Sequence, residues 1–444
     1  MQSAPQRVLS IDALRGLTIA LMILVNDPGD WDHVYTQLDH SPWNGFTLTD
    51  FVFPNFLFLV GASIILSLQA RLARGESRRT MALHMLGRAA VLFAVNLFLA
   101  SFPHFHWTHV RIFGVLTRIA VCYLVAGLLC LAIWNATHRA RTLLAIAAAL
   151  LVGYWALMRF APVPGFGVPT HAMPILDPDR NLAAWLDRGF NAFTQHYLHT
   201  GVLYNRTRDP EGLLSTLPAI ATTLIGCLTG LWLRRARTAT EPGVSTEPGA
   251  PSKAALGVPG ERSLLAGVRS PWVGSIATAV PAVQILRVLL LAGLVSLALG
   301  LLWSFSFPLN KNLWTSSYVL FAAGLSLLLL ALCYWLIDIR RFNQKPAGKA
   351  LIFPWLVFGS NAIFAFVFSN ALVEIMLWIR VPAVALINPA APTTRVTAWF
   401  WTYRYFFARH LSTNLTSVTF ALAFTAVCFL PNWLLWRKKL FLKV

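Results

Sequence analysis

Residues 40–58 combine a histidine, an aspartate and two asparagines with a run of aromatic side chains. The stretch reads His-Ser-Pro-Trp-Asn-Gly-Phe-Thr-Leu-Thr-Asp-Phe-Val-Phe-Pro-Asn-Phe-Leu-Phe and leads into a long apolar segment. A neutral imidazole such as that of His40 can take a proton from an attacking amine or hydroxyl, or can itself accept an acyl group. Asp50 is close enough in the chain to orient this imidazole. By residue type alone, the more ordinary interpretation is an exposed loop histidine.

Charged and amide side chains also flank the first apolar segment. Asp12 and Arg15 are three residues apart, so on a helix they share one face and can pair, and Asn26 lies at the other end of the segment. The pair either anchors the helix at a membrane interface or lies beside a phosphate-bearing ligand. Both interpretations stay open at this point.

Three further cations stand in unusual places. Arg111 and Arg118 are seven residues apart, hence on nearly the same helix face, and Arg118 lies inside an apolar run. A guanidinium in lipid needs a partner, so Arg118 either pairs with an acid such as Asp50 or holds a phosphate or carboxylate ligand. Lys311 and Asn312 belong to a Pro-Leu-Asn-Lys-Asn-Leu-Trp turn in a weakly charged loop.

Other residues with metal or redox chemistry favour a structural interpretation. His104, His106 and His109 could bind zinc or copper, but no acid or thiolate accompanies them, and histidine with aromatic residues is common at membrane interfaces. We therefore expect no metal site. All five cysteines lie in apolar stretches without a CxxC motif and are expected to be small buried side chains: Cys122, Cys130, Cys227, Cys333 and Cys428.

The elements that must position these residues are membrane helices. The chain is 57% hydrophobic and 12% charged, against the roughly 45–50% apolar content of soluble domains. Its net charge of +19 could indicate nucleic acid, but Lys and Arg form short clusters between apolar runs instead of one soluble face. This pattern excludes a soluble nucleic-acid-binding protein.

About ten segments are apolar and long enough to cross a hydrocarbon core of roughly 30 Å. We predict an all-α, polytopic integral membrane helix bundle with about ten transmembrane helices. The first segment has no small-residue cleavage site after it, so we expect it to remain as a span. The predicted spans are 11–27, 50–70, 83–102, 112–134, 141–160, 213–233, 283–305, 314–337, 351–378 and 416–436.

Positive charge marks every second loop. The loop between the first two spans carries aspartates and no Lys or Arg, whereas the second, fourth, sixth and eighth spans and the tenth are each followed by a basic cluster. The positive-inside rule therefore predicts that both termini are cytoplasmic and that the acidic loop with His40 is outside.

The connections divide the chain into two halves. Residues 1–234 form an N-terminal transmembrane half, 235–282 a disordered cytoplasmic linker, and 283–444 a C-terminal transmembrane half. The linker is rich in Pro, Gly, Ala, Ser and Thr and repeats Thr-Glu-Pro-Gly. The outer loop 161–212 mixes aromatic and charged residues with turn signals, which predicts an ordered cap over the outer mouth.

Several of these motifs resemble the heparan-alpha-glucosaminide N-acetyltransferase family, including its bacterial members. The block from Trp43 to Pro54 and the Asn-Lys-Asn-Leu-Trp block are specific, whereas Asp-x-x-Arg-Gly is shared with other membrane acyltransferases. The resemblance runs through nearly the whole chain in family order, over 10–16, 25–26, 40–61, 111–118, Tyr204, 209–213 and 308–318.

The resemblance implies an acyltransferase of a bacterial inner membrane that takes acetyl-CoA from the cytoplasm and acetylates an amino sugar outside, with a homodimer as the expected assembly. The family's catalytic histidine falls on His40 and its nearby asparagine on Asn26, and both are expected to be catalytic residues together with Asp50. The basic inner face would hold the nucleotide while the pantetheine arm threads between helices. The residues expected to bind the donor are Asp12, Arg15, Arg118, Lys311 and Asn312.

Two other classes of protein remain as alternatives. A secondary transporter of a sugar or small polar solute also suits ten helices with buried polar residues, although the two halves show no convincing repeat. A non-catalytic scaffold or lipid-binding protein would leave the polar cluster at the mouths of the first two spans without a purpose. The acceptor, and the choice between an acetyl-histidine intermediate and direct transfer, stay open.

Overall fold

The computed structural model describes residues 8–170, 173–237, 282–383 and 395–442. These residues are mostly helical, and the only sheet among them has two short strands. The prediction of an all-α polytopic bundle is confirmed: nine described helices are long and apolar enough to cross a membrane, and a bent pair makes a tenth span. The predicted linker 235–282 lies almost entirely outside the described residues.

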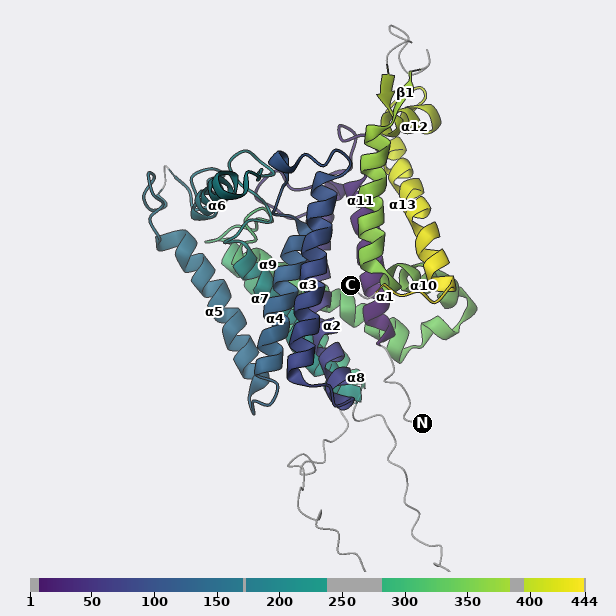
Figure 1. The fold of residues 1–444 in the computed structure, drawn as a ribbon. Coiled ribbons are helices and arrows are strands. Elements are labelled where there is room, and N and C mark those ends of the chain that lie inside the picture. Colours follow the sequence, from purple (N-terminus) through teal and green to yellow (C-terminus); the bar gives the residue numbers. More distant parts are fainter. Residues whose placement is uncertain (1–7, 171–172, 238–281, 384–394, 443–444) are drawn as a thin grey trace, which may run out of the picture.

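The nine straight spans match predicted segments to within a few residues at most ends. Figure 1 shows them packed as a bundle. They are α1 (Leu9–Asn26), α2 (Leu48–Ala73), α3 (Arg78–Ser101), α4 (Val115–Ala132), α5 (Arg139–Phe160), α7 (Thr216–Arg237), α8 (Ala282–Ser304), α9 (Ser316–Tyr334) and α13 (Asn414–Arg437).

The predicted span 351–378 is wrong as a single helix. It consists of α10 (Pro346–Ser360) and α11 (Ala362–Trp378), which meet at an angle of 81°. Asn361 stands at the break, where its amide donates to Leu440 O (3.1 Å) and accepts from Leu442 N (2.8 Å). These hydrogen bonds to the chain that follows α13 stabilise the bend, and in Figure 1 α10 lies across the bundle while α11 stands upright.

Shorter elements connect the spans. The predicted outer cap is ordered and contains α6 (Leu182–Leu198), whereas α12 (Ala398–Phe406) and the antiparallel strands β1 (Arg380–Pro382) and β2 (Arg395–Thr397) were not predicted. The remaining turns are η1 (Thr36–Leu38), η2 (Trp107–His109), the π-helical η3 (Trp335–Ile339) and η4 (Phe342–Gln344).

Helix α2 lies in the centre of the bundle and packs closely on α7. A Cβ atom on Gly61 would stand 1.9 Å from Thr223 O, and one on Gly226 would stand 2.0 Å from Phe58 O. Small residues let two backbones approach in this way, which is how membrane helices gain contact without a hydrophobic driving force. The close packing fixes α2, and with it the loop that carries His40.

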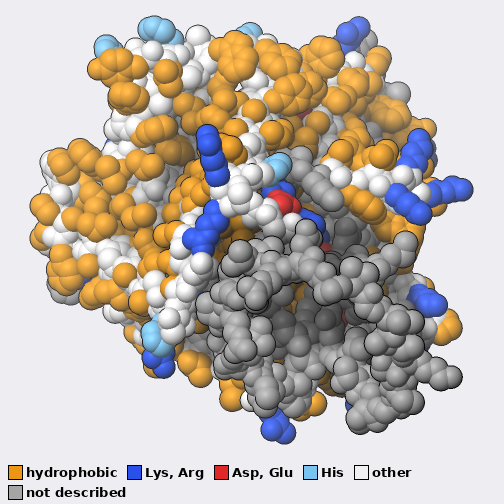
Figure 2. All heavy atoms as spheres, turned by 60° about the horizontal axis from the view of Figure 1, so that its bottom comes forward, with side chains coloured by type: hydrophobic (Ala, Val, Ile, Leu, Met, Phe, Trp, Pro, Cys, Tyr) orange, Lys and Arg blue, Asp and Glu red, His pale blue; other side chains and the backbone are white. Residues whose placement is uncertain are grey.

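The end of the bundle at the bottom of Figure 1 presents many basic side chains. Helix α6, α12 and the β-hairpin lie at the top of Figure 1, and the turn between α2 and α3 lies at the bottom. Figure 2 brings the bottom end forward, and on it Lys and Arg side chains are frequent while Asp and Glu are almost absent. We call these the outer end and the basic end. That the basic end faces the cytoplasm stays a prediction from the positive-inside rule.

Candidate functional site

His40 and Asp50 meet at the outer end, as the sequence suggested. His40 lies in the loop before α2, and its Nδ1 is 2.8 Å from Asp50 Oδ1. Asp50 belongs to the first turn of α2, where it forms a capping box with Thr47. Its second oxygen accepts from Ser41 N (3.1 Å) and Thr47 N (3.2 Å). The Asp50 side chain is 1% exposed and that of His40 is 42% exposed, so a fixed carboxylate holds an accessible imidazole.

This arrangement selects the tautomer of a neutral His40. Because an ionised carboxylate can only accept hydrogen bonds, the contact between Asp50 Oδ1 and His40 Nδ1 requires an N–H on the ring. The ring's other nitrogen, Nε2, then carries the lone pair. Tyr318 supports the same turn from α9 by donating its hydroxyl to Asp50 O (2.6 Å). The result is a base whose free lone pair and orientation are set before any ligand arrives.

Lys311 lies against the imidazole. Its Nζ is 3.0 Å from His40 Nε2 and 3.2 Å from Nδ1. An amine placed on the in-plane lone pair of Nε2 would be much farther from Nδ1 than from Nε2, so Lys311 lies over the ring and leaves that lone pair open. Burial lowers the pKa of Lys311, while the charges of Glu211 and Asp50 act in the opposite direction.

The turn that carries Lys311 is joined to the histidine loop. Asn310, which is fully buried, accepts from Leu313 N (2.9 Å) and donates to Asn44 Oδ1 (3.1 Å). Gly45 N also donates to Leu309 O (2.9 Å). The two sequence blocks that carry the family resemblance are therefore one structural unit. Asn312 is half-buried in the same turn, and its side chain makes no hydrogen bond to the described residues.

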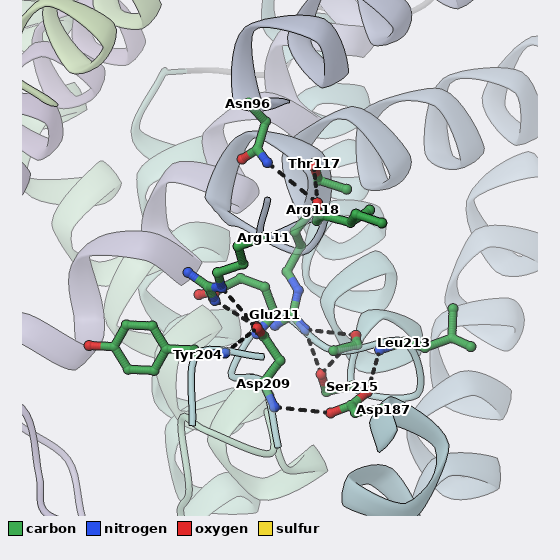
Figure 3. A network of polar contacts seen from close by, with 12 residues as sticks. Asn96, Arg111, Thr117, Arg118, Asp187, Tyr204, Asp209, Glu211, Leu213 and Ser215 are labelled. Carbon is green, nitrogen blue, oxygen red and sulfur yellow. Dashed lines mark hydrogen bonds and ion pairs between the residues drawn. The ribbon is translucent and has the colours of Figure 1, made fainter. Parts of the chain in front are cut away.

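Arg111 forms the strongest ion-pair cluster at this end. It contacts Asp209 through two hydrogen bonds (2.6 and 2.8 Å) and Glu211 through one of 2.5 Å, and its guanidinium lies 4.8 Å from the centre of the Tyr204 ring. Figure 3 shows these side chains converging. The sequence marked the stretch 209–213 only through its family resemblance. The partners were not identified, because nearly one hundred residues separate them from Arg111.

Asp187 of α6 holds the loop that supplies these acids. Its oxygens accept from Asp209 N (3.2 Å) and Leu213 N (2.9 Å), and a Cβ on Gly212 would clash with its carboxylate. The side chain is 2% exposed. Burial, reinforced by the charge of Asp209, raises the pKa of Asp187 to about 6. Sequence analysis missed this residue, which resembles any polar residue of an amphipathic helix.

Arg118 does not pair with Asp50, so that alternative is wrong. Its Nη2 donates to Gly212 O (3.1 Å) and Ser215 Oγ (2.5 Å), and its guanidinium lies 5.0 Å from the centre of the Trp314 ring. The residue is 1% exposed, and its Nε and Nη1 have no hydrogen-bond partner among the described residues. Asp50 is already occupied by His40 and backbone donors, and the loop after Asp209 reaches Arg118 instead, as Figure 3 shows.

The remaining site candidates lie apart from this cluster. Asp12 and Arg15 pair at 2.6 Å near the basic end, and Arg15 Nε also donates to Gly359 O (3.0 Å) beside the break between α10 and α11. Asn26 is the last residue of α1 and is exposed, and no hydrogen bond joins its side chain to His40 in the described part of the chain.

The histidines of the loop between α3 and α4 form local contacts. The rings of His104 and His106 stack at 5.8 Å, and His109 Nδ1 is 2.8 Å from Thr108 Oγ1. Within the described ranges, no three His, Cys, Asp or Glu side chains come together as a metal-binding group. The five cysteines are free, and four of them are buried.

Comparison with known proteins gives a consistent result. Residues 7–266 match the family model described as heparan-alpha-glucosaminide N-acetyltransferase, catalytic. Proteins named heparan-alpha-glucosaminide N-acetyltransferase from Mus musculus and Homo sapiens are each 27% identical to the chain, over 406 and 411 residues. The alignments cover 82% and 83% of this chain but 54% and 53% of the relatives, so the chain spans about half the length of the curated relatives it matches.

Proposed function

Because the chain belongs to the heparan-alpha-glucosaminide N-acetyltransferase family, we propose that it is a transmembrane acyltransferase that moves an acetyl group from acetyl-CoA to an amino sugar. The contact among His40, Asp50 and Lys311 at the outer end is the observation that carries this proposal. It supplies a base of fixed tautomer and a cation within one small volume, which is what transfer of an acyl group to an amine requires.

Each of the three side chains has a distinct role. His40 Nε2 takes the proton from the acceptor's amino group as its nitrogen attacks the thioester carbonyl. Asp50 keeps Nδ1 protonated and stabilises the imidazolium that forms. Lys311, over the ring, stabilises the negative charge that develops on the carbonyl oxygen before the carbon–sulfur bond breaks and the thiolate leaves. The proton held by His40 then neutralises the thiolate.

Other residues bind the two substrates. Arg118 offers the unpartnered N–H groups of its guanidinium to the donor, and Asn312 lies in the same turn as Lys311. Asp12 and Arg15, near the basic end, contact the donor's nucleotide part. We assign Asn26 to the acceptor, because it is an exposed amide at the outer end of α1. The acceptor is a glucosamine-type sugar: free glucosamine, a glycan fragment or a lipid-linked sugar.

The proposed orientation in the membrane follows from the positive charge of the basic end. The chain is a multi-pass membrane protein, and we propose that it resides in a bacterial inner membrane with acetyl-CoA in the cytoplasm, at the basic end. The acceptor is then periplasmic. Only the two-carbon acyl group crosses, because the nucleotide is too polar to pass through lipid. The assembly we propose is a homodimer, as the family resemblance implies.

Acetyl transfer by purified protein tests this function. The full chain in detergent is mixed with acetyl-CoA and a panel of amino sugars, and N-acetylated product is measured by mass spectrometry. We expect product with at least one glucosamine-type acceptor and none from His40→Ala.

A matched control for this experiment lies in the same loop. His33 has the same exposed fraction as His40, 42%, and also pairs with an aspartate, Asp30, at 2.8 Å. His33→Ala should keep its activity. Equal activity of His40→Ala and His33→Ala would overturn the assignment. Uptake of sugar into vesicles without acetyl-CoA would instead favour a transporter.

A further inference from the structure

Tyr204 is an exposed aromatic residue in the outer loop that also carries Asp209 and Glu211. The residue is 67% exposed. Its backbone N–H donates to Asp209 Oδ2 (3.0 Å), whereas its hydroxyl makes no hydrogen bond to the described residues. Exposed aromatic rings are common at membrane interfaces. The contacts of this one indicate a more specific role, which the proposed catalytic steps do not use.

The ring of Tyr204 is held in one position by the ion-pair cluster. The guanidinium of Arg111 lies 4.8 Å from the ring centre. Asp209 and Glu211 fix that guanidinium through three hydrogen bonds, and Asp209 also accepts from the backbone of Tyr204. Because most of the residue is exposed, the face of the ring opposite Arg111 is open. Figure 3 shows the ring pointing away from Arg118, which is buried.

The loop with Tyr204 borders the proposed catalytic group at two points. Arg208 lies over the ring of Trp43, with its guanidinium 4.8 Å from the ring centre, and Trp43 belongs to the same loop as His40. The charge of Glu211 acts on Lys311, whose Nζ lies 3.0 Å from His40 Nε2. A ligand that contacts this loop can therefore also reach the imidazole.

Glu211 has one carboxylate oxygen available for a ligand. Its Oε2 accepts from Arg111, whereas its Oε1 accepts no hydrogen bond from the described residues and is not sealed from solvent. An ionised carboxylate oxygen accepts strong hydrogen bonds from hydroxyl and ammonium groups. The loop thus combines an open aromatic face with a free acceptor.

We propose that the open face of Tyr204 and Oε1 of Glu211 form a subsite for the pyranose ring of the acceptor. This inference rests on the proposed function, because it names the part of the outer end that binds the amino sugar. The C–H groups on one face of the sugar pack on the electron-rich face of the aromatic ring. Glu211 accepts from a sugar hydroxyl or from the ammonium group. Aromatic walls with a few placed polar groups are typical of small-molecule sites.

Sugar binding without acetyl-CoA tests the subsite separately from catalysis. The full chain in detergent is titrated with glucosamine and with a β-1,4-linked glucosamine disaccharide, and saturation-transfer difference NMR detects the bound sugar. We expect Tyr204→Ala to raise the dissociation constant about tenfold. Tyr204→Phe should bind as the unchanged protein does, because the ring remains. In the transfer reaction, Tyr204→Ala should raise KM for the sugar and leave kcat nearly unchanged.

Tyr197 offers a matched control in the same outer cap. It is 65% exposed, and its ring contacts Phe193 and His196 of α6. Tyr197→Ala should bind the sugars as the unchanged protein does. Equal affinities of Tyr204→Ala and Tyr197→Ala would overturn the subsite, as would equal losses in Tyr204→Ala and Tyr204→Phe.

The two proposals fail in different ways. Sugar binding that depends on the Tyr204 ring, without any acetyl transfer, would support the subsite and contradict the proposed function. Acetyl transfer with an unchanged KM in Tyr204→Ala would overturn the subsite alone. Absence of sugar binding by the unchanged protein would also overturn it.

Discussion

The charged side chains at the outer end and at the basic end of the bundle differ in their partners and in their burial. At the outer end, Arg111 pairs with Asp209 and Glu211, and the buried carboxylates of Asp50 and Asp187 accept backbone hydrogen bonds. Near the basic end, Asp12 and Arg15 form an ion pair whose side chains are 21% and 25% exposed. Partners within the chain fix the geometry of the outer groups, which suits catalysis. The pair at the basic end is more exposed, so solvent screens it and it contributes less to stability.

The largest expected effect concerns activity at the outer end. His40→Ala should lower the rate of acetyl transfer about 10³-fold, within the range that a general base contributes. Its side chain is 42% exposed, so the thermal midpoint should change little. A rate within tenfold of the unchanged protein would remove His40 from the chemistry. Rapid release of one equivalent of CoA before an acceptor is added would indicate an acetyl-histidine intermediate.

The outer ion-pair cluster should be the most important electrostatic contribution to stability. Arg111→Met leaves the buried carboxylates of Asp209 and Glu211 without a cation, at a cost of about 3–5 kcal/mol in the free energy of unfolding. Denaturation in detergent measures this loss. Adding Asp209→Asn and Glu211→Gln should recover much of it. A loss below about 1 kcal/mol would show that water, not Arg111, compensates these acids.

Asp187 should make stability depend on pH. Its pKa rises from 3.8 to about 6 on folding, so between these values the folded protein holds a proton that the unfolded chain releases. The contribution of Asp187 to the free energy of unfolding therefore falls as pH rises through this window, by about 3 kcal/mol at most, and is level above it. Thermal denaturation from pH 4.5 to 7.5 measures the slope. Asp187→Asn should make this slope smaller. An unchanged slope would mean that groups other than Asp187 cause the pH dependence.

Asp50→Asn separates orientation from proton transfer. The amide can still serve the capping box but places an N–H group or a weaker acceptor against His40 Nδ1, which disfavours the active tautomer. We expect a rate about 10²-fold lower with nearly unchanged substrate affinity. Initial rates over a range of acceptor concentrations give kcat and KM separately, and so distinguish a slower reaction from weaker binding of the acceptor. A change confined to KM would mean that Asp50 binds the acceptor.

The smallest effect sharpens the comparison between the two ends. Asp12 and Arg15 pair at 2.6 Å, the same distance as Arg111 and Asp209, but both side chains of the first pair are more than 20% exposed. Asp12→Asn should therefore cost less than about 1 kcal/mol of stability. Denaturation of Asp12→Asn and Arg111→Met under the same conditions gives the ratio of their losses in the free energy of unfolding. Equal losses would mean that burial does not determine how much these ion pairs contribute to stability.

Hydropathy was sufficient to predict most of the fold. The apolar segments became helices because lipid demands that backbone groups pair within the segment. The bend at Asn361 was not predictable, since it depends on hydrogen bonds to residues eighty positions away. Helix α12 and the β-hairpin were missed because they are too short to span a membrane.

The site was predictable where its members are close in the chain. His40 and Asp50 lie on either side of one helix start, so the sequence indicated that they could come into contact, and the structure joins them. The position of Lys311 over the ring, and the partners of Arg111 and Arg118, depend on how distant loops pack. The false expectation of a pair between Arg118 and Asp50 arose for the same reason. Sequence identified the charges that need partners without identifying the partners.

The sidedness of the reaction tests the central claim most directly. The protein is reconstituted into vesicles whose orientation is known from protease access to the basic loops, with acetyl-CoA on one side and the amino sugar on the other. We predict N-acetylated product only when acetyl-CoA is on the side of the basic end and the sugar is on the side of His40, and none with His40→Ala. Product formed only when both substrates share one side would contradict the transfer across the membrane.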